Sequence, residues 1–428
     1  MEGGLDLSAE LRNDKFEGLS MRKHVIVIIG FVYGVICLCS CGSQSQDRAK
    51  PEEIGLSSRH LRQLDTVVEE AVTRKDFPGA VLLVGRKGKV VYRKAFGNSQ
   101  LIPQRRPMEE TMIFDLASLT KPVATATSIM ILVEQGRLSL DEKVKDYVPE
   151  FSPYVDEAGK PAEDARIWHL LTHTSGLPPI TDALEVEKKY GRPCSLDNLV
   201  SHISQLKKSD PPGAVFSYSC LGYITLAYVL KKISGQDIAT FSEEHIFKPL
   251  EMKHTFFVPP EKYRASCVAT EVVEGKPLLG VVHDPLARLQ GGVSGNAGLF
   301  STADDLATFA MMMLSKGQYK GRRILSPLTV ERMTSIWPKA SFAGRGLGWD
   351  IDSSYSTTGG DLFGPRSYGH TGFTGTSIWI DPDTETFVIF LTNRVHPDVK
   401  ASIVAMRSRV ANVVAASIEV AGASSVRR

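Results

Sequence analysis

A serine followed three residues later by a lysine stands where an apolar run, residues 112–117, meets a long segment with a helical pattern. The two residues are Ser118 and Lys121. This spacing puts both side chains on one face of a helical turn. A serine hydroxyl is a weak nucleophile until a base accepts its proton, and a lysine amine can be that base where a desolvated, electropositive site lowers its pKa. The tetrapeptide therefore indicates a nucleophile with its own base, although it also suits an ordinary helix start capped by Ser118.

Four further segments follow in a fixed order. They are Trp168 to Leu177 (WHLLTHTSGL), Tyr218-Ser219-Cys220, Gly298 to Leu306 (GLFSTADDL) and His370-Thr371-Gly372. Together with the Ser-x-x-Lys motif they resemble the ordered signature of the serine β-lactamase and penicillin-binding protein superfamily. The resemblance is strongest to the class C-like branch, which includes esterases, D-aminopeptidases and D,D-peptidase-like proteins. It extends from about residue 54 to the last predicted helix.

The resemblance implies a role for each of three side chains. Ser118 is the nucleophile that becomes acylated, and Lys121 accepts its proton. Tyr218 is a second base, which relays a proton to and from the leaving group. A phenol has an ordinary pKa near 10, but a neighbouring ammonium such as that of Lys121 favours its anion.

The third motif is expected to begin an edge strand that borders the site. His370 and Thr371 belong to this strand, and Gly372 lets the substrate backbone approach closely. By resemblance, the backbone N–H groups of Ser118 and Phe373 form the oxyanion hole. Donors of this kind each contribute on the order of 3 kcal/mol in the transition state.

Two residues depart from the usual pattern of the family. Cys220 stands at a substrate-binding position, where the second motif of the family usually has an asparagine that holds the substrate amide and the lysine by hydrogen bonds. A thiol is a weak donor and acceptor. His370 replaces the lysine of true β-lactamases, and a neutral imidazole attracts a carboxylate less strongly than an ammonium does. Arg394 is a candidate to bind a substrate carboxylate through its guanidinium group in place of that lysine. The alternative is that Arg394 forms a surface salt bridge.

These departures favour an esterase, amidase or peptidase that acts through an acyl-enzyme on a less anionic small-molecule or peptidoglycan-derived substrate. A β-lactamase or D,D-carboxypeptidase is the alternative from the same class. A penicillin-binding sensor that acylates without turnover is the alternative from another class, since Cys220 could impair deacylation. A burst of product with no further turnover would distinguish the sensor from a hydrolase.

Residues 1–41 have the pattern of a leader. A basic stretch at about residue 21 and an apolar run from Val25 to Leu38 resemble a signal peptide over about 21–40, and residues 38–41 resemble a lipobox with Cys41 as the lipidated cysteine. We expect Met21 to be the true start and residues 42–53 to be a flexible tether; an uncleaved N-terminal anchor is the alternative. This pattern predicts a lipid-anchored protein on the periplasmic face of a bacterial membrane.

The rest of the chain, residues 54–428, is long enough for one large two-lobed hydrolase domain. The formal net charge is only +2, and no basic run indicates nucleic-acid binding. We expect no metal and no other cofactor, and the oligomeric state has no signature. Cys194 and Cys267 could pair in an oxidising compartment.

Turn residues and apolar periodicity predict an α+β fold. Hairpins are expected at 80–92 and 376–391, and helices at 119–136, 221–232, 303–316 and 399–421. The resemblance implies an antiparallel sheet flanked by helices, with an all-helical lobe contributed by about 125–290. The loops 178–212 and 340–366 are expected to line the cleft.

Overall fold

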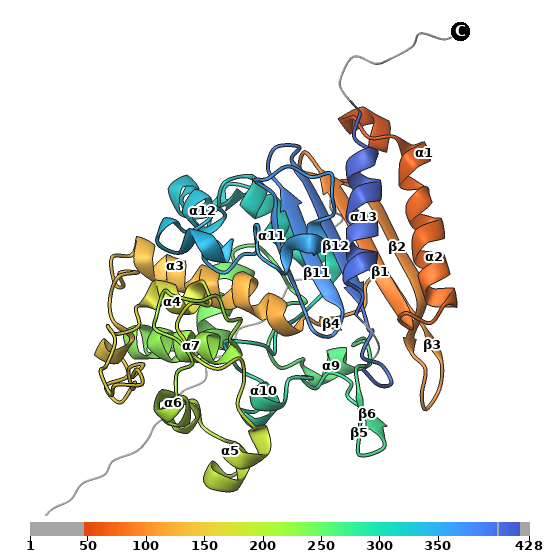
Figure 1. Ribbon diagram of the computed structural model, residues 1–428. Coiled ribbons are helices and arrows are strands. Elements are labelled where there is room, and N and C mark those ends of the chain that lie inside the picture. Colours follow the sequence, from red (N-terminus) through yellow and green to blue (C-terminus); the bar gives the residue numbers. More distant parts are fainter. Residues whose placement is uncertain (1–46, 400–401, 420–428) are drawn as a thin grey trace, which may run out of the picture. The chain divides into compact units, whose positions relative to one another are not determined.

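The central element is an antiparallel sheet that joins the two ends of the chain (Figure 1). Its strands run in the order β10 (Tyr368–Thr371), β11 (Thr376–Asp381), β12 (Thr386–Thr392), β1 (Gly79–Arg86), β2 (Lys89–Gln100) and β3 (Arg106–Pro107). β12 lies beside β1, with Ala80 opposite Thr392. The computed structural model describes residues 47–399 and 402–419, and all of them belong to one compact unit.

Both predicted hairpins are present, and local turn chemistry explains the first. β1 and β2 are joined by Lys87 and Gly88, whose φ angles are 48° and 72°. Two consecutive positive φ angles are what a two-residue hairpin turn needs to match the twist of its strands. Every residue of β1 is buried, because helices cover both faces of the sheet.

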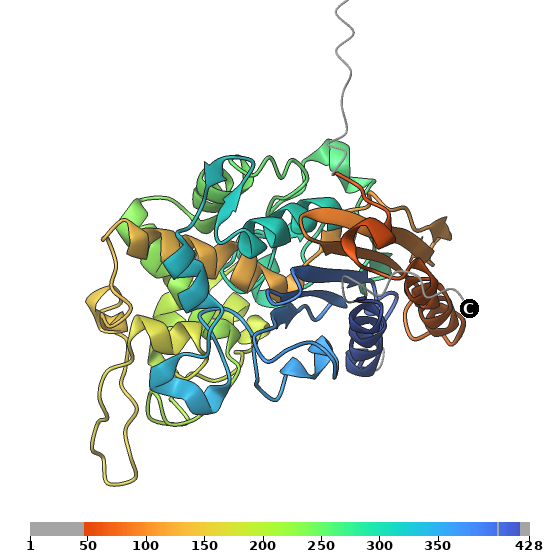
Figure 2. The ribbon, with the colours of Figure 1, turned by 90° about the horizontal axis from the view of Figure 1, so that it is seen from above.

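The two faces of the sheet carry different layers, as alternation along β1 requires. Leu82 and Val84 pack with α2 (Gln63–Thr73) and α13 (Val404–Ala416). Val81 and Leu83 face the larger core, which includes α11 (Ala303–Leu314). Figure 2 shows the sheet between these layers, with α2 and α13 together on one side.

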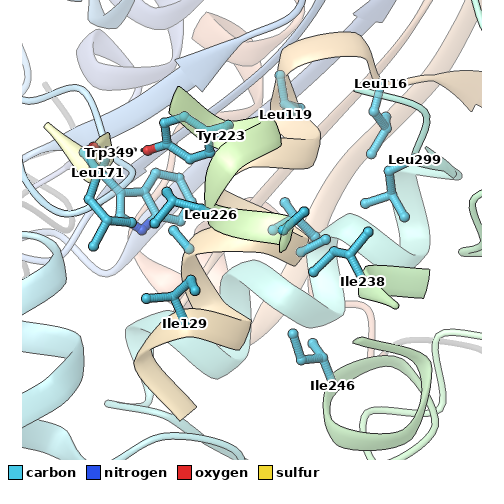
Figure 3. Close-up of a cluster of buried hydrophobic side chains, with 14 of the residues drawn as sticks. Leu116, Leu119, Ile129, Leu171, Tyr223, Leu226, Ile238, Ile246, Leu299 and Trp349 are labelled. Atoms are coloured by element: carbon cyan, nitrogen blue, oxygen red, sulfur yellow. Dashed lines mark hydrogen bonds between the residues drawn. The ribbon is translucent and has the colours of Figure 1, made fainter. Parts of the chain in front are cut away.

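The helical part of the unit is built around α7 (Cys220–Ser234), which is buried over most of its length. It packs against α3 (Thr127–Glu134), α4 (Ile167–Leu171) and α6 (Leu196–Gln205). In Figure 3, Tyr223 and Leu226 of α7 lie among Leu119, Ile129 and Leu171. The Tyr223 hydroxyl donates a hydrogen bond of 2.9 Å to the Leu171 carbonyl. This core fixes the helix that begins at Cys220 against the segment that carries Ser118 and Lys121.

The remaining helices and strands are short. They are α1 (Ser58–Leu61), β4 (Phe114–Asp115), α5 (Ala183–Tyr190), α8 (Ile238–Ser242), α9 (Glu261–Arg264), β5 (Val272–Val273), β6 (Lys276–Pro277), α10 (Pro285–Leu289), β7 (Phe300–Ser301), β8 (Gln318–Tyr319), β9 (Arg322–Arg323) and α12 (Pro327–Met333). Across residues 47–399 and 402–419, no helix combines the length and apolarity that crossing a bilayer requires.

The α+β fold is confirmed, and four details of the prediction are corrected. The C-terminal helix covers Val404–Ala416 and is shorter than 399–421. The predicted helix 119–136 is divided into a 3-10 turn η2 (Ala117–Leu119), a π-helical segment η3 (Lys121–Ala126) and α3. His370 and Thr371 end the edge strand β10 and do not begin it. Cys194 and Cys267 are both free thiols.

Candidate active site

Ser118 lies in η2, directly after a residue with an unusual backbone conformation. Ala117 has a φ of 46°, which is rare for a residue with a side chain and costs free energy. The buried Asp115 carboxylate holds this turn, since it accepts hydrogen bonds from the N–H groups of Ala117 (2.9 Å) and His283 (2.7 Å). The hydroxyl of Thr376 also donates to the Leu116 carbonyl at 2.9 Å. The serine turn is therefore held by contacts from two distant parts of the chain, at His283 and Thr376.

Lys121 is fully buried at the start of η3, and three acceptors surround its ammonium group. Its Nζ donates to Ser118 Oγ at 3.0 Å, to the Asn296 carbonyl at 2.9 Å and to Cys220 Sγ at 3.5 Å. Burial lowers the pKa of Lys121, but the neighbouring Cys220 and Tyr218 side chains more than offset this effect when they are ionised, so its pKa is raised. Desolvation by itself therefore does not decide the pKa of Lys121.

Tyr218 completes a group of three with Ser118 and Lys121. Its ring centroid lies 5.1 Å from Lys121 Nζ, and it shares the wall of one cavity with Ser118. Its ring stacks on His173 at a centroid distance of 4.2 Å and lies 5.4 Å from the ring of Tyr355. Burial raises the pKa of Tyr218 and the Lys121 charge opposes the rise, with a raised pKa as the net result. The resting group is thus an ammonium, a phenol and a serine hydroxyl.

His370 is 3 % exposed and faces the same site from the end of β10. Its Nδ1 lies 2.9 Å from the Thr371 carbonyl, which assigns the ring proton to Nδ1. Burial, with the positive charges of Arg345 and Lys121, lowers the pKa of His370 well below its ordinary value. The imidazole is therefore neutral, as the sequence predicts.

The turn after β10 lies directly against the serine turn. A side chain at Gly372 would collide with Thr376 Oγ1 and the Leu116 carbonyl, so only glycine fits there. The ring of Phe373 is 52 % exposed, and the Arg394 guanidinium lies 4.7 Å from its centroid. Within the described residues, no acceptor takes a hydrogen bond from the Phe373 N–H.

A cavity of about 320 Å³ opens beside Ser118 and Tyr218. Its wall includes His370, Thr371, Gly372, Phe373 and Arg394, all of which the sequence identifies. Cys220 is not in this wall, and its Sγ lies against Lys121 instead. The structure thus brings the predicted catalytic and binding residues together, with one exception. Cys220 contacts Lys121 and is not part of the cavity wall. Cys41 lies outside the described residues.

Several residues of the cavity wall are not identified by any motif in the sequence. They are Arg345, Asp350, Tyr355, Ser402, Ile403, Val404 and Arg407. Three of them come from the predicted cleft loop 340–366, whereas the loop 178–212 contributes none to this cavity. One signal was available for Arg407. It falls on the apolar stripe of Ile403, Val410 and Val414, where a charge is out of place.

The wall is positively charged in spite of the neutral His370. Arg345 is 1 % exposed and pairs with Asp350 at 3.4 Å, while its Nε and Nη2 are buried with no hydrogen-bond partner among the described residues. Arg394 and Arg407 add two further guanidinium groups. The inference from His370 that the substrate is less anionic is therefore not supported, because arginines supply the charge that the missing lysine would carry.

Comparison with known proteins agrees with this geometry. The Beta-lactamase family profile matches residues 64–412. An N-acetylmuramyl-L-alanine amidase of Bacillus subtilis (strain 168) is 33 % identical, over 81 % of this chain and 84 % of the relative. A protein of Escherichia coli (strain K12), provisionally named a D-alanyl-D-alanine carboxypeptidase, is 30 % identical, over 82 % of this chain and 86 % of its own length.

A solved structure extends the likeness to the fold. EstCE1, a hydrolase with promiscuous acyltransferase activity, superimposes with a TM-score of 0.67 at 22 % identity, and the match covers 83 % of this chain and 99 % of EstCE1. The family profile spans most of the chain, and the serine, lysine and tyrosine lie together beside one cavity. The chain belongs to the Beta-lactamase family and is a serine acyl hydrolase.

Proposed function

We propose that this enzyme hydrolyses an amide or ester bond in a peptidoglycan-derived peptide through an acyl-enzyme on Ser118. The observation that carries the proposal is the 3.0 Å contact between Lys121 Nζ and Ser118 Oγ in a fully buried site. Once Lys121 has lost its proton, its amine accepts the Ser118 proton as Oγ attacks the carbonyl carbon. Tyr218 then delivers a proton to the leaving group, and a water molecule attacks the ester by the reverse route.

The developing oxyanion is stabilised by the backbone N–H groups of Ser118 and Phe373. Such donors act when they point to where the charge appears in the transition state. The Phe373 N–H has no acceptor within the part of the chain that the structure describes, and this supports the role. His370, Thr371 and Gly372 border the bound substrate, and Arg394 binds its carboxylate from above the Phe373 ring.

The arginine-rich wall favours a substrate with a free carboxylate, and the names of the two relatives favour a cell-wall peptide. We expect an N-acylated D-alanyl-D-alanine peptide with a free C-terminus to be cleaved with a kcat/KM about 10- to 100-fold above that of its C-terminal amide. The reason is that one hydrogen bond to a charged group contributes roughly 1.5–3 kcal/mol. A p-nitrophenyl ester and a chromogenic cephalosporin complete the panel.

Each alternative has its own outcome in this panel. Equal cleavage of the acid and the amide, together with fast ester hydrolysis, would replace the peptidase by an esterase. Preference for the cephalosporin would make the protein a β-lactamase. A stoichiometric burst without turnover on every substrate would make it a penicillin-binding sensor.

We further propose that the protein is exported and anchored through lipid on Cys41. The leader pattern motivates this proposal, and the amidase name of the Bacillus relative supports a site of action at the cell wall. A single acyl chain gives only marginal membrane binding, so firm anchoring needs the several chains of a bacterial lipoprotein.

When the full chain is expressed in a bacterium, the wild type is expected in the membrane fraction and Cys41→Ser in the soluble fraction. Cys39→Ser is the matched control, because it removes a leader thiol two residues away. Equal partitioning of Cys41→Ser and wild type would exclude the anchor.

A further inference from the structure

Arg407 is a buried arginine on α13, and it contacts the turn that carries Phe373. A single nitrogen, Nη2, donates to the Gly372 carbonyl at 3.0 Å and to the Thr376 carbonyl at 2.9 Å. These two carbonyls lie at the two ends of the turn 372–376. Arg407 thus bridges the ends of this turn from the helix behind it.

The turn does not depend on Arg407 for its own closure. The Gly372 N–H donates to the Thr376 carbonyl at 2.8 Å, and the Gly375 N–H donates to the Gly372 carbonyl at 3.1 Å. Both carbonyls would therefore keep one donor if the guanidinium were removed. What Arg407 adds is a link between the turn and α13, which fixes the position of the turn relative to the rest of the site.

Among the residues that the structure describes, no carboxylate balances the charge of Arg407. No ion pair is formed by Arg407 within residues 47–399 and 402–419, whereas Arg345 in the same wall pairs with Asp350. Its Nε is buried and lacks a hydrogen-bond partner among those residues. Burial, and then the charge of Arg394, lower its pKa to about 9. A buried cation without a counter-charge destabilises a fold, so stability does not explain this residue.

We propose that Arg407 is a positioning residue for catalysis, which holds the 372–376 turn so that the Phe373 N–H serves as an oxyanion donor beside Ser118. The inference rests on the proposed function, since it assigns the Phe373 N–H to the oxyanion hole. The turn is held from the opposite side by the serine turn, because Thr374 Oγ1 donates to the Asp115 carbonyl at 2.7 Å. Arg407 and Thr374 therefore set the separation between the nucleophile and the second donor.

The test replaces Arg407 with methionine, which keeps most of the aliphatic stem. We expect kcat to fall about 100-fold, because a misplacement near 1 Å costs about this factor, while KM stays within about threefold. Guanidinium chloride at low millimolar concentration is expected to restore activity several-fold in Arg407→Met and not in the wild type. The melting temperature is expected to stay the same or to rise. Arg409→Met, at an exposed position of the same helix, is the matched control and should keep wild-type kcat.

Three outcomes would overturn the role of Arg407. They are an unchanged kcat in Arg407→Met, a raised KM with kcat retained, and a lost activity that follows a lowered melting temperature without guanidinium rescue. If the methionine variant does not fold, Arg407→Lys is measured in the same way. The lysine side chain is one bond shorter, so its ammonium stops short of the two carbonyls that Nη2 reaches. We therefore expect kcat to fall with KM unchanged, and a wild-type kcat in this variant would refute the role. Labelling that survives Ser118→Ala would instead refute the proposed function.

Discussion

Replacing Ser118 with alanine is expected to lower kcat/KM by at least about 10⁴-fold and to abolish covalent labelling by a fluorophosphonate or a penicillin probe. The reason is that Ser118 Oγ is the hydroxyl in contact with Lys121 Nζ and beside the cavity. Removing the nucleophile of an acyl-enzyme mechanism leaves only the contribution of binding and the oxyanion hole. Labelling is followed by intact-protein mass, and turnover by the peptide and ester panel.

Ser128→Ala is the control for this experiment. Ser128 is buried ten residues further along the same segment, and its hydroxyl has no hydrogen-bond partner among the described residues. The control should therefore keep both labelling and turnover. If Ser118→Ala still labels at one probe per chain, another residue is the nucleophile and the proposed mechanism fails.

Much of the site could be predicted because its chemistry is local in the sequence. Ser118 and Lys121 are three residues apart, so one helical turn brings them together without any tertiary information. The hairpin at Lys87 and Gly88 was equally local, since its turn depends on two residues that adopt positive φ. The resemblance to a family supplied Tyr218 and Phe373, whose proximity to Ser118 depends on the whole fold.

The positions of Arg345 and Arg407 in the cavity wall do not follow from any motif in the sequence. Arg345 and Arg407 lie in a loop and in the last helix, and neither belongs to a motif. Arg407 reaches the cavity because α13 lies against the turn 372–376. Arg345 reaches it because Asp350, its ion-pair partner, is paired with Gly369 of β10. When these two arginines are not considered, the neutral imidazole of His370 indicates a weakly anionic substrate. With them, the same imidazole lies in a positively charged wall, where the charge of Arg345 helps to keep it neutral.

The pKa of Lys121 likewise depends on side chains that are distant in the sequence. Burial lowers the pKa of a lysine, and that effect can be foreseen from a motif. The opposing effect comes from Cys220 and Tyr218, about a hundred residues away, which as anions favour the ammonium. The position of Cys220 in the second motif suggests a contact with the substrate, but its Sγ lies 3.5 Å from Lys121 Nζ. The cysteine therefore acts on the base and not directly on the substrate in the cavity.

The raised pKa values of Lys121 and Tyr218 predict a steep pH dependence. At pH 7, an amine whose pKa is raised above its ordinary value is free in only a very small fraction of molecules. Because the free amine is the form that accepts the Ser118 proton, log kcat/KM should rise by about one per pH unit from pH 6 to 9, without a plateau. Lys121→Met should remove both this rise and nearly all activity. A plateau below pH 8 in the wild type would show that the base has a lowered pKa.

Tyr218→Phe is expected to lower kcat by about 10²- to 10⁴-fold, the range that general acid–base catalysis contributes. Phenylalanine keeps the ring that stacks on His173 and removes only the hydroxyl that relays the proton. It also removes a hydroxyl that raises the pKa of Lys121 once it is ionised, so the residual activity should reach its maximum at lower pH than in the wild type. Tyr228→Phe, at another buried tyrosine of α7, is the control for a lost buried phenol. A Tyr218→Phe enzyme with wild-type kcat and an unshifted pH profile would show that Lys121 works without a relay, and that the leaving group takes its proton from the lysine itself.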